Sequence, residues 1–223
     1  LLRMSEVIHE TSRLPFDNIV SLSGPSHAEE VSIGCPTAVV VGGTGESAVK
    51  LIQKEISSET FRIYTNSDVV GVELGGSVKN VIAIASGICD GIDFGDNTKA
   101  ALITRGIVEI ARLGVDMGAK AETFSGLSGI GDLIVTCLSR HSRNRYVGEE
   151  IGKGKKLENV VSNMKMVAEG VKTTKSVKAL SKKYNVEMPI CSAVHDVLFK
   201  DDNPKEAVEK LMTRDLISEN FIL

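Results

Sequence analysis

The 223-residue sequence predicts a mainly α protein, in which an all-helical C-terminal domain follows the incomplete last part of an α/β sheet. Short apolar runs alternate with helix-periodic segments up to Thr65, a rhythm typical of open sheets covered by helices. From Asp68 onward the strand signals stop, and apolar residues recur only with helical spacing. We therefore expect two domains, 1–68 and 69–223, with a ligand cleft between them.

The expected elements follow from this periodicity. The first domain should hold a helix over 1–11, strands at 19–22, 37–41 and 61–65, and a helix over 47–56. The second should hold two long helices over 70–88 and 97–113, and shorter ones at 121–127, 132–138, 143–152, 160–164, 174–184, 189–199 and 204–211. Asn203 before Pro204 is typical of a helix start. Thr173 or Thr174 can cap the helix expected after Gly170.

Composition excludes several classes of function. The net charge of -3 indicates no nucleic-acid partner, and no apolar run is long enough for stable membrane insertion. The four cysteines stand far apart, at Cys35, Cys89, Cys137 and Cys191, with no metal-ligand spacing. We therefore expect free thiols, a cytoplasmic location and no metal site.

The first residues raise the question of self-association. Leu1, Met4 and Ile8 fall on one side of the expected helix. In a monomer this apolar face would be exposed, which favours a possible homodimer. The chain begins without Met inside this helix, so we expect further residues before it in the complete protein.

A glycine-rich turn at 43–48 fits the pattern G-x-G-x-x-A, follows a strand and opens a helix. These features are typical of a pyrophosphate-binding loop. However, Asp68, the candidate ribose partner, lies among turn residues past the end of the next strand. We interpret the segment as a surface turn.

The segment 71–85 carries the clearest chemical signal. Gly75 and Gly76 cost about 1 kcal/mol each in a helix relative to alanine, so close approach of a cofactor or another backbone should compensate. Lys79 lies one turn beyond them among apolar residues, which suits its amine to proton transfer in carbonyl reduction. A lysine whose stem packs and whose amine reaches solvent would look the same. With Asn80 and the glycine pair beside it, both interpretations stay open.

Asp132 follows a stretch rich in glycine and precedes an apolar run. It can cap the following helix, and it can also orient Lys79 or accept a hydrogen bond from a substrate hydroxyl. A carboxylate can serve both purposes.

Arg140, Arg143 and Arg145, with Ser142 and Asn144, surround the start of the helix expected at 143–152. Backbone N–H groups, the helix dipole and guanidinium groups together suit a phosphate. A solvated basic turn fits the same spacing.

A Gly24-Pro25-Ser26 turn follows the strand expected at 19–22. The carboxyl end of a strand is where open α/β sheets bind ligands. An ordinary strand-to-helix turn has the same composition.

These segments together resemble the NAD(P)-dependent glycerol-3-phosphate dehydrogenases of bacteria. The matching blocks are LSGPSHAE at 22–29, VELGGSVKNVIAIASG at 72–87, TFSGLSGIGDLIVTC at 123–137, SRNRYVG at 142–148 and VAEGV at 167–171. The resemblance covers essentially the whole chain. It implies a Rossmann sheet whose front part, with the pyrophosphate loop, precedes this sequence, and a helical domain like that of 6-phosphogluconate dehydrogenase.

The resemblance also implies roles for particular residues. The enzyme would interconvert dihydroxyacetone phosphate and glycerol 3-phosphate with NAD or NADP, for glycerophospholipid synthesis, and Lys79 would be its proton donor and acceptor. Contacts to this small phosphorylated substrate would come from Gly24, Ser26, Lys79, Asp132, Ser142, Arg143 and Asn144. The cofactor would lie along Ala28, Arg143, Val167 and Glu169.

Two alternatives remain. A hydroxyacid dehydrogenase of the same superfamily would also use a lysine on the long helix, but would act on carboxylate-bearing substrates. By itself this chain could instead be a non-catalytic, self-associating helical module. Without the front of the sheet, we expect it to bind cofactor poorly.

Overall fold

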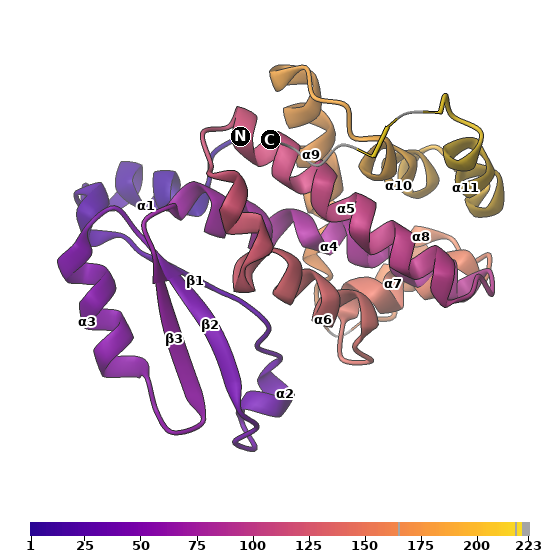
Figure 1. Cartoon of the computed structure of the whole chain (residues 1–223). Coiled ribbons are helices and arrows are strands. Elements are labelled where there is room, and N and C mark those ends of the chain that lie inside the picture. The colour runs from indigo at the N-terminus through magenta and orange to yellow at the C-terminus, as the bar shows by residue number, and fades with distance from the viewer. Residues whose placement is uncertain (165, 217, 220–223) are drawn as a thin grey trace.

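The computed structural model describes residues 1–164, 166–216 and 218–219 of the chain. It is mostly helical, with a small three-stranded mixed sheet near the N-terminus, which confirms the predicted fold class. In Figure 1 the sheet and the first helices lie on one side, and the remaining helices are gathered on the other. Of the predicted domain 69–223, residues 165, 217 and 220–223 lie outside the described part.

The N-terminal part alternates helices and strands. Its elements are α1 (Met4–Ser12), a 3-10 turn (Phe16–Asn18), β1 (Ser21–Ser23), α2 (Ala28–Val31), β2 (Thr37–Gly42), α3 (Glu46–Ile56) and β3 (Phe61–Asn66). The strand order is β1-β2-β3, and β2 pairs with β3 in parallel. A small core forms where the β-branched residues Val39, Val41 and Ile63 pack with Val49 of α3. The short helix α2 was not expected from the sequence.

β1 departs from the prediction in its bounds, and its direction bears on the turn that follows it. It begins at Ser21, and it runs antiparallel to β2, with Ser23 opposite Val40. The turn after β1 therefore does not lie at the carboxyl edge of the parallel strands. Gly24 lies beside Val39 instead, with a φ of 144°, and a Cβ on it would come within 2.9 Å of Val39 Cα. Only glycine fits this backbone readily.

The glycine-rich turn at 43–48 packs against the 3-10 turn, which supports its interpretation as a plain turn. Thr44 Oγ1 donates to Asp17 Oδ1 at 2.7 Å, and a Cβ on Gly45 would meet the Asp17 carbonyl. The start of α3 therefore faces a carboxylate and a carbonyl oxygen, which are poor neighbours for a pyrophosphate.

The second part of the chain is helical throughout. Its elements are α4 (Val69–Gly91), α5 (Asp96–Asp116), a 3-10 turn (Ala121–Ser125), a π-type turn (Leu127–Gly131), α6 (Asp132–Leu138), α7 (Arg143–Gly152), α8 (Leu157–Ser162), α9 (Glu169–Tyr184), α10 (Pro189–Phe199) and α11 (Pro204–Met212). Asn203 caps α11 as predicted, because its side chain accepts hydrogen bonds from Lys205 N and Glu206 N.

Helix α4 is the centre of this bundle. Asp68 caps its start, and the Asp68 carboxylate accepts hydrogen bonds from Gly71 N at 2.9 Å and from Thr123 Oγ1 at 2.7 Å. Helices α5, α6, α7 and α9 all pack against it (Figure 1). By length and composition α4 could cross a membrane, but 61% of its most apolar window is buried in the protein. It is a core helix.

Three local predictions were wrong. No single helix covers 121–127, because a 3-10 turn and a π-type turn replace it. Asp132 does not cap α6, since the preceding residue is Gly131 and the Asp132 side chain points elsewhere. Helix α9 begins at Glu169, so Thr173 and Thr174 lie inside it, where their hydroxyls donate to carbonyls four residues back.

Candidate functional site

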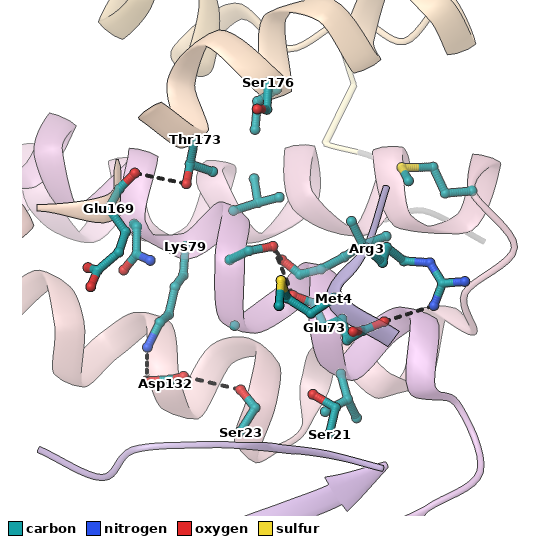
Figure 2. Close-up of a pocket in the computed structure, with 18 of the residues that line it drawn as sticks. Arg3, Met4, Ser21, Ser23, Glu73, Lys79, Asp132, Glu169, Thr173 and Ser176 are labelled. Atoms are coloured by element: carbon teal, nitrogen blue, oxygen red, sulfur yellow. Dashed lines mark hydrogen bonds and ion pairs between the residues drawn. The ribbon is translucent and has the colours of Figure 1, made fainter. Parts of the chain in front are cut away.

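A cleft of about 640 Å³ separates the sheet from the helical bundle. The start of α1, the end of β1, one face of α4, the start of α6 and one face of α9 enclose it. Figure 2 shows Ser21 and Ser23 on the sheet side, Lys79 and Asp132 beside them, and Glu169, Thr173 and Ser176 on α9. The volume of the cleft is in the range typical of small-molecule sites.

Lys79 and Asp132 form an ion pair in the wall of this cleft. Lys79 Nζ contacts Asp132 Oδ1, and the side chains are 16% and 4% exposed. Thr136 Oγ1 also donates to Asp132 Oδ1, at 3.3 Å. Burial raises the pKa of the Asp132 carboxyl, while Lys79 and Thr136 oppose that rise. Of the two sequence interpretations of Lys79, the structure favours an amine held in a cleft over one that reaches bulk solvent.

The adjacent glycines of α4 allow two close contacts. A Cβ on Gly75 would collide with the backbone carbonyl of Ser128, and a Cβ on Gly76 would lie 2.6 Å from Ser23 Oγ. The cost of two glycines in a helix is therefore compensated by the close approach of another backbone at one of them and of a strand side chain at the other. Both contacts lie within one turn of Lys79.

Ser142 caps the start of α7, a role that was not predicted from the sequence. Ser142 Oγ accepts a hydrogen bond from Arg145 N at 3.2 Å. Arg143 lies at the first helical position and pairs with Glu169 of α9, at 3.4 Å between NH2 and Oε1. Arg145 points away from the cleft, where it pairs with Asp90 at 2.7 Å. One guanidinium of the basic cluster is therefore near the cleft, and another belongs to a separate ion pair.

Asn144 joins three helices behind the cleft. Its Nδ2 donates to Asn80 Oδ1 at 3.0 Å, and its Oδ1 accepts from Gly170 N at 2.9 Å. Asn144 is buried, whereas Asn80 lines the cleft. Asn144 therefore ties the start of α9 to Asn80 on α4, the helix that carries Lys79.

The structure brings part of the predicted site together. Five of the predicted residues line the cleft: Gly24, Ser26, Lys79, Asp132 and Glu169. Arg143 and Asn144 reach it through their partners, and Ser142 is buried as the cap of α7. Ala28 and Val167 do not line the cleft, and both are exposed.

Sequence reasoning missed a second polar cluster at the other end of the cleft. Glu73 accepts hydrogen bonds from Ser5 N at 2.8 Å, from Ser5 Oγ at 2.7 Å and from Arg3 NH1 at 2.8 Å. Figure 2 shows the pairing of Glu73 with Arg3. These bonds hold the beginning of α1 against α4. The sequence showed only that Glu73 lies on the same segment as Lys79. Its partners are about 70 residues away along the chain, so the local pattern could not identify them.

No cluster of three or more His, Cys, Asp or Glu side chains suited to a metal ion occurs within residues 1–164, 166–216 and 218–219. The ionised groups that line the cleft in this part of the chain are lysine, arginine and carboxylate side chains. Such a set suits proton transfer and anion binding.

Comparison with known families gives two matches. The family model described as the C-terminus of NAD-dependent glycerol-3-phosphate dehydrogenase matches residues 68–209, and the family model of the N-terminus matches residues 1–49.

Similar proteins and structures carry the same description. A glycerol-3-phosphate dehydrogenase [NAD(P)+] of Salinibacter ruber is 56% identical over 100% of this chain and 65% of its own length. One of Pelotomaculum thermopropionicum is 57% identical over 96% of this chain and 62% of its own. The crystal structure of glycerol-3-phosphate dehydrogenase from Coxiella burnetii superposes with a TM-score of 0.85 at 42% identity, covering 87% of this chain and 60% of that one. The chain thus spans less than two thirds of the length of these relatives.

Proposed function

Because this chain belongs to the NAD-dependent glycerol-3-phosphate dehydrogenase family, we propose that the complete protein interconverts dihydroxyacetone phosphate and glycerol 3-phosphate. The cofactor is NAD or NADP, and the product enters glycerophospholipid synthesis. The observation that carries the proposal is Lys79, an amine held by Asp132 in the wall of a cleft large enough for a three-carbon phosphate.

Lys79 is the acid and base of this reaction. When bound, the nicotinamide cofactor supplies the hydride that converts the ketone to the alcohol. Protonated Lys79 donates a proton to the oxygen of that carbon, and its neutral amine accepts the proton in the reverse direction. Asp132 stabilises the protonated amine and fixes its direction.

The substrate phosphate lies at the start of α7. Arg143 is 39% exposed and its only ion pair among the described residues is with Glu169, at 3.4 Å, so it is available to an anion. A guanidinium at the first turn of a helix suits a phosphate, because the unpaired N–H groups and the dipole add to its charge. Gly24, Ser26, Ser142 and Asn144 complete the proposed contacts.

The residues proposed for the cofactor fit that role by accessibility. Val167 is 62% exposed, the Glu169 side chain is 54% exposed and Ala28 is exposed. These positions and Arg143 would hold the nicotinamide end beside Lys79. Fluorescence titration of the full-length protein with NADH and NADPH tests the binding, and Glu169→Ala should weaken it for both.

Location and assembly are further parts of the proposal. The four cysteines are free, and burial raises the pKa of Cys89 to about 11 and of Cys137 to about 12, which keeps these thiols protonated. A reducing cytoplasm suits such thiols. Met4 and Ile8 of α1 are 65% and 37% exposed, and Leu1 just before the helix is 67% exposed; this apolar face supports a homodimer. The domain boundary is proposed at Asp68, which caps α4.

A substrate comparison tests the reaction. The full-length protein should oxidise NADH or NADPH with dihydroxyacetone phosphate, and much more slowly with 2-oxo acids of similar size. Preference for a 2-oxo acid would instead identify a hydroxyacid dehydrogenase. The 223-residue chain, assayed in parallel, should be inactive or nearly so.

The exposed face of α1 also supports a second, non-catalytic candidate for the 223-residue chain alone, which is self-association. Light scattering on the purified chain should then give twice the monomer mass. Replacing Leu1 and Met4 by Ser should restore the monomer. A monomer without any substitution would exclude this candidate.

A further inference from the structure

Ser23 lies between the sheet and the proposed catalytic pair. It is the last residue of β1, and its Oγ donates to Asp132 Oδ2 at 3.5 Å (Figure 2). Ser23 itself is partly buried, whereas Asp132 is 3% exposed. The sheet therefore reaches the carboxylate that holds Lys79 through one hydroxyl group.

The two oxygens of Asp132 have different partners. Oδ1 contacts Lys79 Nζ and accepts from Thr136 Oγ1. Oδ2 accepts from Ser23, which is its only hydrogen-bond donor in the described part of the chain. Because the carboxylate is buried, the loss of this donor would leave one oxygen without a partner from the protein. Ser23 is thus placed to control the rotation of the carboxyl group.

Gly76 permits this arrangement. A Cβ at position 76 would lie 2.6 Å from Ser23 Oγ and 3.4 Å from Ser23 Cβ, so any larger residue would displace the hydroxyl. Neighbouring Gly75 contacts the backbone of Ser128, a separate requirement. One of the two helical glycines is therefore explained by the position of the Ser23 hydroxyl.

We propose that Ser23 is a positioning residue that orients Asp132, and through it Lys79, and that Gly76 is glycine to admit the Ser23 hydroxyl. The proposal rests on the function proposed above. Under this proposal, the orientation of Lys79 depends on how β1 packs against α4. Ser23 itself needs no contact with the substrate.

The test compares steady-state kinetics of full-length variants at several pH values. Ser23→Ala should lower kcat about tenfold, as expected for one hydrogen bond to a charged group, with KM for dihydroxyacetone phosphate changed less than about twofold. The hydroxyl favours the ionised carboxylate, so its loss should move the acidic limb of the kcat profile to higher pH. Ser23→Thr, which keeps a hydroxyl, should retain most of kcat.

Gly76→Ala provides an independent route to the same defect. It should reproduce the lowered kcat and the shifted acidic limb. The variant that combines Ser23→Ala with Gly76→Ala should have a kcat no lower than that of the less active single variant. Ser57→Ala and Gly95→Ala are matched controls, since Ser57 is exposed and a Cβ on Gly95 meets nothing within 4 Å. Thermal unfolding of each variant identifies loss of folding.

Different outcomes separate the two proposals. If the wild-type protein fails to reduce dihydroxyacetone phosphate, the proposed function is wrong. If the wild type is active but Ser23→Ala keeps kcat and the acidic limb, or raises KM alone, the positioning role is wrong. If Ser23→Ala does not fold, full activity of Gly76→Ala overturns the proposal, and a lowered kcat with a shifted acidic limb in Gly76→Ala supports it.

Discussion

Lys79 on α4 pairs with the buried carboxylate of Asp132, at the first position of α6, in the cleft wall. Replacement of Lys79 by Ala in the full-length protein should lower kcat by about 10²- to 10⁴-fold, the range for loss of a general acid. The nicotinamide cofactor should bind nearly as before. Stopped-flow and fluorescence titration measure the two quantities.

Lys79→Arg is the informative companion, because it keeps the charge beside Asp132 but does not release a proton at neutral pH. It should be as inactive as Lys79→Ala while remaining as stable as the wild type. Substantial turnover by either variant would contradict the proton-transfer role.

Arg143 should determine the preference for a phosphorylated substrate. Arg143→Ala should lower kcat/KM for dihydroxyacetone phosphate by about 10- to 100-fold, as expected for a hydrogen-bonded charge pair. The much lower activity with dihydroxyacetone, which has no phosphate, should change little. Arg145→Ala is not a suitable control, since Arg145 pairs with Asp90 and Glu149 in the bundle. An equal loss of kcat/KM for both substrates would contradict a role of Arg143 in binding the phosphate.

Gly148 lets α7 cross α4 at close range. A Cβ there would meet the Ile84 carbonyl and lie 2.8 Å from Ile88 N, and both are backbone atoms of the core helix. Gly148→Ala should therefore lower the free energy of unfolding by about 1–3 kcal/mol, a typical cost of overpacking. Urea unfolding measures it, and Gly95→Ala should change it far less. A stability equal to that of the wild type would mean that the helices can separate at no cost.

Glu109 of α5 caps α10 from the side. Its carboxylate accepts hydrogen bonds from Ile190 N at 2.7 Å and from Cys191 N at 3.2 Å. Burial raises its pKa from 4.5 to about 7, and the two N–H donors only partly oppose that rise. The folded state therefore binds the proton more tightly than the unfolded state. The resulting contribution to stability is full below about pH 4.5 and is lost as the pH rises to about 7.

Glu109→Gln should remove this pH dependence. Between pH 5 and pH 7 the wild type should lose stability more steeply than the variant, by no more than about 1.4 kcal/mol per pH unit for one proton. Urea unfolding at several pH values measures the slopes. Glu59→Gln, on the surface, should keep the wild-type slope. Parallel profiles for wild type and Glu109→Gln would show that the group titrates normally.

Much of the fold was readable from local pattern. Helices α6, α7 and α10 begin and end at the predicted residues, because caps, prolines and helical periodicity are properties of neighbouring positions. The largest errors fell where backbone geometry is unusual. The π-type turn before Asp132 has no periodic signature, and a three-residue strand is too short to show one.

The helical character of the chain and the family to which it belongs could be inferred from local sequence pattern and matching blocks. The same blocks contain the lysine, the carboxylate and the arginine of the proposed site. Three features depend on long-range packing and could not be predicted: β1 runs antiparallel, Asp132 holds Lys79 rather than capping α6, and Ser23 fills the space left by Gly76. The reason is physical. Helix propensity depends on residues a few positions apart, whereas the direction of a buried carboxylate depends on donors supplied by distant segments once the chain has packed.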